Sequence, residues 1–372
     1  MSANKNHTPL FHIVKRDQSP WYYNLGVRAI AVVSALILCA VVIFLLTIEK
    51  QSDGTLKLIN PLDVYGSMIE GSFGNSVRLW SLLQEIVMLL CVSLAITPAF
   101  KMRFWNIGAE GQVLVGGLAT VSVMMFLGPV LPTPVLIIVM IAASILAGII
   151  WAVIPAVAKA LWNTNETLFT LMMNYVAIQL VSFFLKTFVK SGSGVLAPME
   201  EFGLPVLFGQ KYLLNIIIVL LLTVAVYIYL KYTKQGYEIS VVGESENTAK
   251  YIGINVKKVI IRTLVVSGAL CGIAGLLLVG GTNHTIDTQT AGGRGFTAIM
   301  VSWLAKFNPI IMIFTSFLVV FLSKGASQVS TDFRIPEAIS DIVTGIILFF
   351  IIGCEFFLQY KIVFTKSRKE NV

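Results

Sequence analysis

Charged residues are scarce in this sequence. Of its 372 residues only 12% are Asp, Glu, Lys or Arg, whereas 56% are hydrophobic. A soluble domain carries roughly 25% charged and 45–50% apolar residues. The shortage of charge excludes an intrinsically disordered chain, which would be polar and highly charged. The apolar excess instead predicts a membrane protein.

Cysteine and histidine are also few, with four and three residues respectively. No CxxC pair occurs, and each cysteine lies in or beside an apolar run, so a disulfide scaffold is excluded and buried thiols are expected. The polar segment 282–287 holds a single histidine, which favours a surface loop or a docking surface over a metal site. We expect no metal and no cofactor. The cysteines are Cys39, Cys91, Cys271 and Cys354.

Several motifs of energy conversion and catalysis are missing. The sequence has no GxxxxGK[ST] phosphate loop, so ATP hydrolysis of the P-loop kind is excluded. It has no HExxH and no GxSxG, which removes the usual protease and hydrolase mechanisms. A TVGYG filter and a ladder of arginines are absent too, which disfavours a potassium channel and a voltage sensor. The chain is therefore not expected to be an enzyme.

Long apolar runs dominate what is present. A spanning helix needs roughly 20 apolar residues to cross a hydrocarbon layer about 30 Å thick. The sequence predicts an all-α, polytopic membrane protein with about ten transmembrane helices. The eighth and ninth are short, so they are either two short crossings or one re-entrant hairpin. The predicted spans are 28–47, 81–99, 107–127, 135–158, 167–189, 211–230, 259–281, 295–305, 310–323 and 337–360.

The distribution of basic residues predicts the orientation. With the N-terminus inside, roughly two thirds of the 27 Lys and Arg fall in inner segments, as the positive-inside rule requires. Both termini are then cytoplasmic, and the net charge of +8 reports topology rather than a nucleic-acid partner. The expected organisation is a cytoplasmic tail (1–27), a transmembrane domain (28–360) with a cytoplasmic loop (231–258), and a second tail (361–372).

Carboxylates inside predicted spans are candidates for a transport pathway, because a buried charge costs at least about 2.5–3.5 kcal/mol and needs a cavity or a partner. Glu85, Glu110, Asp341 and Glu355 are such residues, and Glu166 opens the fifth span. They leave open an ion-coupled secondary transporter as an alternative function.

The segment 106–112, with Asn106, Glu110 and Gln112, starts the third span. Asn106 could be the helix cap and Glu110 a first-turn acid, which is a structural role. Alternatively, the segment is a polar element at the cytoplasmic mouth of the pathway, since its glycines permit a broken, cavity-lining backbone.

Two further spans carry informative residues. In the fifth, Thr164 or Asn165 is expected to cap the helix and Glu166 to lie in its first turn. Asn174 and Tyr175 follow more deeply, as pathway residues or as partners in interhelical hydrogen bonds. In the seventh, glycines at 268, 272 and 275 share one face and predict close helix packing.

The loop 231–258 has the signals of a short helix. Ser245 is a suitable cap, Glu246 suits the first turn and Gly253 is a suitable stop. A helix of about two turns is marginal alone in water, so it is expected to dock against something. The alternative is a solvated loop lying on the membrane.

Two stretches of sequence resemble the permease subunits of ABC importers, in the nucleoside and simple-sugar branch of the branched-chain amino acid and ribose group. Residues 104–112, FWNIGAEGQ, are similar to the N-I-G-x-E-G-Q signature of that branch. Residues 243–254, GESENTAKYIGI, resemble its G-x-N-P-x-A-A-x-Y-x-G-I cytoplasmic loop, although residues 245–248 depart from the usual Asn-Pro start. Residues 167–175 and 293–299 also match in style.

The resemblance implies a multi-pass subunit of a bacterial cell membrane that imports a solute, nucleosides first and a simple sugar as the alternative. It implies a cytoplasmic ATPase subunit, a second related permease chain that forms the other half of the pore, and an extracytoplasmic binding lipoprotein. Pathway candidates are Asn106, Glu110, Gln112, Glu166, Asn174, Tyr175 and Phe296. Residues implied to couple to the ATPase are Gly243, Glu244, Asn247, Ala249, Tyr251 and Gly253.

Overall fold

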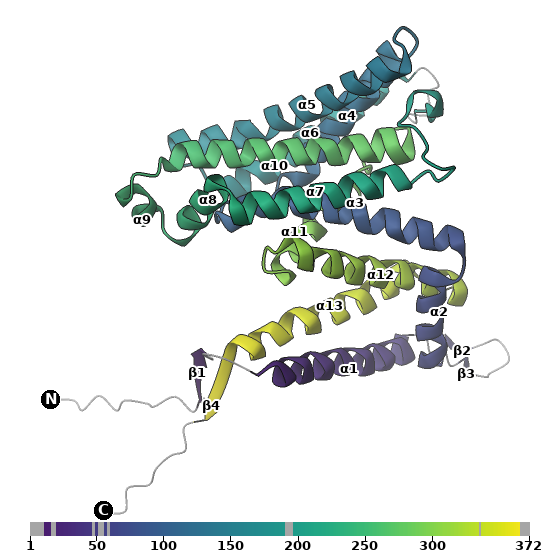
Figure 1. Cartoon of the computed structure of the whole chain (residues 1–372). Helices are drawn as coiled ribbons and strands as arrows, with labels where there is room; N and C mark the ends of the chain where they lie inside the picture. The colour runs from purple at the N-terminus through teal and green to yellow at the C-terminus, as the bar shows by residue number, and fades with distance from the viewer. Residues whose placement is uncertain are drawn as a thin grey trace, which may run out of the picture. The chain divides into compact units, whose positions relative to one another are not determined.

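The computed structural model describes residues 11–15, 20–46, 49–50, 56–57, 60–189, 196–334 and 336–364. These residues are helical apart from two small antiparallel strand pairs and the connecting loops (Figure 1), which confirms the all-helical expectation. The chain divides into two compact units. The larger comprises residues 76–320, and the other is formed by residues up to 75 and from 321 onward.

Each of the ten expected spans coincides with a helix of the structure. In the larger unit the helices are α3 (Ser76–Lys101), α4 (Ala109–Leu127), α5 (Thr133–Trp162), α6 (Glu166–Phe188), η1 (Glu200–Phe202), α7 (Leu213–Tyr232), α8 (Lys234–Glu244), α9 (Glu246–Tyr251), α10 (Val256–Leu278), the π-helix η2 (Val279–Asn283) and α11 (Arg294–Leu304).

The core of the larger unit is α10, which packs on α5, α4 and α3. The glycines at 268, 272 and 275 pack closely against α5 and α4, which confirms the predicted role. A Cβ added to Gly268 would lie 2.5 Å from the Cβ of Ala152 on α5, and one added to Gly116 on α4 would lie 2.8 Å from the Cα of Gly272. In a bilayer, apolar burial contributes little to helix association, so small residues stabilise the bundle by letting helix backbones pack closely.

The eighth and ninth predicted spans differ in length. The eighth is α11, whose 11 residues extend about 16 Å, roughly half of a hydrocarbon core. The ninth is α12 (Pro309–Phe333), whose 25 residues are long enough to cross completely, so a short ninth helix is wrong. The expected end at 323 stopped before the polar residues 324–333. These continue the helix because they find partners, such as Asp332 Oδ2, which accepts from Ser67 Oγ at 2.5 Å.

The smaller unit pairs α1 (Trp21–Leu46) with α13 (Glu337–Gln359), and strand β1 (Phe11–Lys15) with β4 (Tyr360–Phe364). A second strand pair, β2 (Glu49–Lys50) with β3 (Leu56–Lys57), precedes α2 (Pro61–Phe73). The sequence did not predict α2. Asn60 caps it, with its Oδ1 accepting from Leu62 N–H at 3.1 Å, and a proline at its first position favours the helix start.

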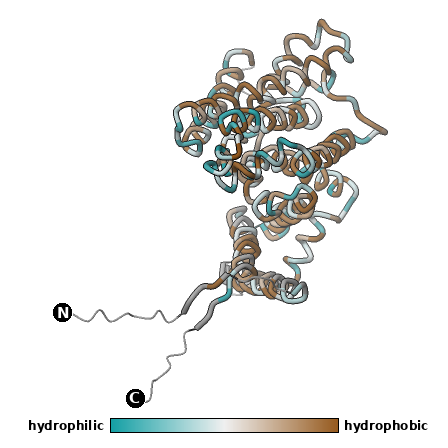
Figure 2. The backbone as a smooth tube through the Cα atoms, turned by 60° about the vertical axis from the view of Figure 1, so that its left-hand side comes forward, coloured by the Kyte–Doolittle hydropathy of each residue, from teal (hydrophilic) through white to brown (hydrophobic). Residues whose placement is uncertain are grey.

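Within the part of the chain that the structure describes, seven helices are long and apolar enough to cross a membrane: α3, α4, α5, α6, α7, the continuous α10–η2 segment and α12. In α1 and α13 the apolar stretches are shorter, Ala29–Val42 and Ile342–Leu358. Figure 2 shows the hydrophobic residues following the long helices, with hydrophilic residues concentrated at turns and ends. The chain is thus a multi-pass membrane protein. The side chains of Asp341 and Glu355, predicted as buried acids, lie outside the described residues.

Candidate functional site

Between α3 and α4 the chain makes a tight loop that carries Asn106. The Asn106 side chain is fully buried, and its Oδ1 accepts from Gly108 N–H at 3.1 Å and from Gln112 Nε2 at 3.3 Å. Its Nδ2 lies 3.4 Å from Ser267 Oγ on α10. Helix α4 begins at Ala109 with Gly108 at the N-cap position, so Asn106 as the helix cap is wrong. Its side chain fastens the loop instead.

The loop contacts α10 and α6 at different distances from their first residues. Ser267 comes 11 residues after the start of α10, a rise of about 16 Å. Thr170 and Asn174, which also bind the loop, lie one to two turns inside α6. The position of this loop at the cytoplasmic mouth of a pathway stays a prediction.

Asn174 satisfies the polar backbone of this loop. Its Nδ2 donates to the Ile107 carbonyl at 2.9 Å, and its Oδ1 accepts from Gly111 N–H at 2.8 Å. Thr170 Oγ1 accepts from Ile107 N–H at 3.2 Å. A Cβ on Gly111 would lie 2.9 Å from Asn174 Oδ1, so only glycine fits there. Asn174 was predicted to be either a pathway residue or a partner in interhelical hydrogen bonds, and the structure shows the hydrogen bonds. Buried backbone groups need such partners, and Asn174 supplies them for this loop.

Glu110 caps another helix. It lies in the first turn of α4, as predicted, but its carboxylate accepts two backbone N–H groups of α11, from Gly293 to Oε1 and from Gly295 to Oε2, each at 2.7 Å. The first amides of a helix have no intrahelical partner and carry the positive end of its dipole. A buried carboxylate from α4 therefore fixes where the half-length helix α11 begins.

Arg294 lies between these two glycines, at the start of α11, and pairs with Glu85 of α3. Their Nη2 and Oε2 atoms are 2.5 Å apart, and both side chains are largely shielded. Glu85 and Glu110, two of the predicted buried acids, therefore both have partners near the start of α11. Among the described residues no group of three or more His, Cys, Asp or Glu could hold a metal ion.

A buried polar cluster that the sequence did not reveal lies beside the π-helix η2. Asn215 Nδ2 is 3.1 Å from Thr282 Oγ1 and 3.4 Å from Gln84 Oε1, and Gln84 Nε2 donates to Thr282 at 2.5 Å. π-Helical turns within α-helices occur frequently at functional sites. The sequence signal for this cluster was Asn215, a lone Asn in the run of Leu and Ile that forms α7.

The remaining pathway candidates lie nearer the surface. Glu166 Oε2 pairs with Lys159 Nζ at 2.9 Å, and Asn165 caps α6 by accepting from Leu168 N–H, which confirms the predicted cap. Tyr175 is 58% and Phe296 46% exposed. The structure thus separates the candidates into a buried framework and a few accessible side chains.

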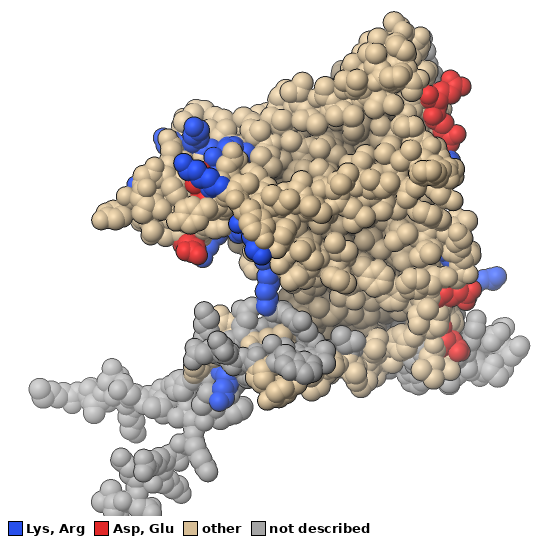
Figure 3. Space-filling view, viewed as in Figure 1, with Lys and Arg blue, Asp and Glu red and all other residues tan. Residues whose placement is uncertain are grey.

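Helices α8 and α9 form the end of the larger unit where Lys and Arg gather in Figure 3. The short helix α9 was predicted, and Ser245 Oγ caps it by accepting from Thr248 N–H at 3.2 Å. Gly253 follows with φ of +84°, in the left-handed region that favours glycine. Helix α8 was expected as loop. It forms because Ile239, Val242 and Gly243 make one buried face.

The predicted coupling residues divide by exposure. Gly243 and Ala249 are buried, and a Cβ on Gly243 would collide with the Lys101 carbonyl oxygen of α3. Tyr251 is 92% exposed. The buried pair holds α8 and α9 against the bundle, whereas the exposed residues are free to contact a partner. Glu244, Asn247 and Gly253 are exposed as well.

Comparison with known proteins decides the family. The sequence model of the family described as "Branched-chain amino acid transport system / permease component" matches residues 78–352. The chain belongs to this family. It is thus an ABC importer permease subunit, a transmembrane component that does not itself hydrolyse ATP.

Three relatives of this permease show how its similarity is distributed. The glucose ABC transporter permease protein TsgB13 of Haloferax volcanii is 28% identical over 328 residues, 84% of this chain and 86% of the relative. The guanosine ABC transporter permease protein NupP of Bacillus subtilis is 28% identical over 296 residues, 77% and 84% of the two chains. The nucleoside ABC transporter permease protein NupB of Lactococcus lactis is 26% identical over 326 residues, 84% and 89%.

Within the permease, the two predicted motif regions have different tasks. The first, residues 104–112, is held by α6 and α10 and in turn holds α11. The second, residues 243–254, rests on the α8–α9 end and presents Tyr251 outward. In the sequence, residues 293–299 and residues 104–112 are two separate segments that match the family pattern. The structure brings them together through Glu110.

Proposed function

We propose that this permease carries nucleosides inward and forms half of the translocation pathway, driven by a cytoplasmic ATPase that contacts α9. The observation that carries the coupling role is the geometry of α9. The helix is fixed at its start by the Ser245 cap and at its centre by buried Ala249, while Tyr251 is almost fully exposed. A short helix fixed in this way can transmit a displacement from a soluble partner to the bundle.

The partners follow from this assignment. A permease without a phosphate loop needs an ATPase subunit, and one bundle needs a second, related permease to enclose a pathway. A binding lipoprotein would deliver the solute at the opposite end of the bundle. We place the α8–α9 end in the cytoplasm because its lysines, which include Lys234, Lys250 and Lys258, agree with the positive-inside rule.

Nucleosides are favoured as cargo by the resemblance of residues 104–112 and by two relatives named for guanosine and nucleosides. Exposed aromatic rings near the loop support this choice: Trp105 and Trp303 have ring centroids 5.6 Å apart, and Phe296 is also exposed. Stacking on aromatic rings contributes about 1–3 kcal/mol per base, an energy that a sugar without a base does not gain.

A simple sugar is the second candidate, because the relative TsgB13 is named for glucose. An ion-coupled mechanism is disfavoured by the partners of Glu85 and Glu110. Glu85 is paired with Arg294, and Glu110 is bound by two backbone amides, so each has a structural partner.

The substrate is tested by uptake into vesicles that contain the permease with its ATPase, second permease and binding protein. We expect ATP-dependent accumulation of labelled uridine or guanosine that a hundredfold excess of glucose leaves unchanged. Competition by glucose, with no uptake of either nucleoside, would assign the permease to sugars. A Trp303→Leu variant, beside a matched Phe314→Leu variant on α12, is expected to lower nucleoside uptake selectively if aromatic stacking contributes.

A further inference from the structure

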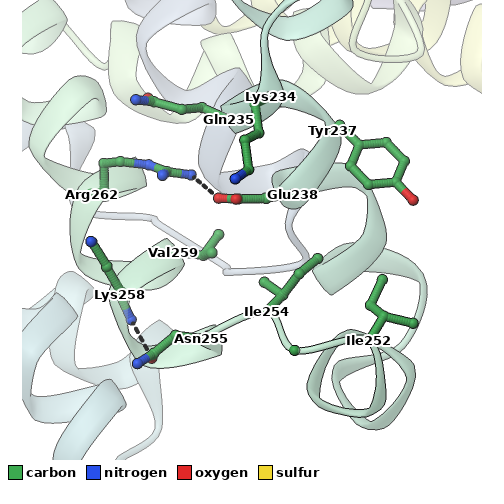
Figure 4. Close-up of a pocket in the computed structure, with 11 residues that line it drawn as sticks. Lys234, Gln235, Tyr237, Glu238, Ile252, Ile254, Asn255, Lys258, Val259 and Arg262 are labelled. Atoms are coloured by element: carbon green, nitrogen blue, oxygen red, sulfur yellow. Dashed lines mark hydrogen bonds and ion pairs between the residues drawn. The ribbon is translucent and has the colours of Figure 1, made fainter.

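A basic cavity opens between α8, α9 and the start of α10. Its volume is about 590 Å³, and it is lined on one side by Lys234 and Glu238 of α8 and on the other by Lys258 and Arg262 of α10 (Figure 4). Lys258 and Arg262 are four residues apart, so their side chains share one face of the helix. Residues 252–255 close the cavity on the side of α9.

The charges that line the cavity are not balanced. Its single acid, Glu238, is already engaged by Arg262, whose Nη2 lies 2.8 Å from Glu238 Oε2. The cations Lys234 and Lys258 have no such acidic partner in the cavity wall. The cavity therefore offers two lysine ammonium groups to an anion, beside the Arg262 guanidinium that is paired with Glu238.

The backbone adds to the attraction for an anion. Asn255 caps α10 by accepting from Lys258 N–H at 3.1 Å, so the positive end of this helix dipole lies at the cavity wall. A helix start combined with basic side chains suits phosphate groups in particular, because several N–H donors converge on one anion.

The position of the cavity specifies the source of the phosphate. Helix α10 starts the apolar segment Val256–Asn283, a candidate membrane span, so the cavity lies at one end of that span. At the rim, Tyr237 is 62% and Ile252 50% exposed, the amphipathic and apolar side chains typical of a membrane interface. The volume is also much larger than one phosphate ion needs and can admit a glycerophosphate headgroup.

We propose that this cavity binds the headgroup of an anionic phospholipid, with Lys234, Lys258 and Arg262 as the phosphate-binding residues. The lipid would occupy the angle between α8 and α10, next to the α9 helix. Basic recesses at the cytoplasmic ends of transmembrane helices are suited to such headgroups, with a contribution of about fivefold in affinity from each lysine near the surface.

The test is the affinity of the full-length purified chain for dioctanoyl phosphatidylglycerol in a neutral detergent, measured by native mass spectrometry, with dioctanoyl phosphatidylcholine as reference. Lys234→Gln and Lys258→Gln should each weaken phosphatidylglycerol binding about fivefold, and the double variant about 25-fold. Glu238→Gln should leave it unchanged or tighten it. Lys250→Gln and Lys257→Gln remove the same charge nearby but outside the cavity, and should have little effect.

Three results would overturn the proposal. Equal weakening by all four lysine variants would show a diffuse surface field instead of a site. Binding of glycerol phosphate as tight as that of the lipid would assign the cavity to a soluble phosphate compound. Loss of ATPase binding in Lys258→Gln, with phosphatidylglycerol affinity unchanged, would assign it to an acidic surface of the protein partner. All the substituted lysines are exposed, so these variants are expected to fold.

Discussion

Replacing Glu110 should release the start of α11. Glu110→Gln keeps the size of the side chain but converts one carboxylate oxygen into an NH₂ donor. Since both oxygens accept backbone N–H groups, from Gly293 and Gly295, one of those bonds must be lost and two donors would face each other.

The magnitude follows from these contacts. A hydrogen bond to a charged group contributes about 1.5–3 kcal/mol, and a buried donor without a partner costs about 1–3 kcal/mol. Loss of the negative charge at the helix start removes up to about 2 kcal/mol more. We therefore expect docking of α11 to weaken by about 3 kcal/mol, which makes its open form roughly a hundredfold more populated.

The assay is maleimide labelling of a cysteine introduced as Val301→Cys, at a fully buried position of α11. The four native cysteines are buried, so their background labelling should be slow. Because labelling of the open form follows local unfolding, its rate should rise in Glu110→Gln by up to the same factor. Glu166→Gln, another first-turn acid paired with Lys159, is the matched control and should leave the rate unchanged. An unchanged rate in Glu110→Gln would refute the capping role.

Three further predictions concern packing, pH and coupling. Gly272→Leu should lower folded yield through a clash of about 3 kcal/mol or more with the Ser144 carbonyl, whereas Gly345→Leu, which faces open space, should not. Burial lowers the pKa of His284 below its usual 6.5, so the unfolded chain takes up the proton first and stability should fall as pH drops below 6.5. His284→Asn, which suits the left-handed backbone there, should reduce that fall in thermal unfolding between pH 7 and pH 5. Tyr251→Ala should weaken ATPase binding about thirtyfold with unchanged melting temperature; unchanged binding would contradict the coupling role.

Sequence reasoning located the spans because apolar length is set by the bilayer, and each of the ten expected segments contains a helix. It also identified the glycine face of α10 and the Ser245 cap, which are local patterns. It missed the true end of α12. The polar residues there are tolerated only because α2 provides a hydrogen-bond partner such as Ser67, and pairing between distant segments is not visible in local composition.

The same distinction explains the site. Local reasoning assigned Glu110 to the first turn of its own helix, which is correct, but its partners are 183 and 185 residues further along the chain. Asn174 was recognised as needing a partner, yet the identity of that partner, the loop at Ile107, depends on how α6 packs. The cluster around Asn215 was missed because its members come from three separate helical segments.

We propose that this bundle moves solute only with energy that an ATPase delivers through α9. The most direct measurement is nucleoside uptake into vesicles that hold the complete transporter, with ATP withheld while the ion gradients are kept intact, and with ATP supplied while a protonophore collapses them. We predict no uptake in the first condition and normal uptake in the second. Uptake without ATP, or accumulation against a gradient by this chain reconstituted alone, would contradict the account.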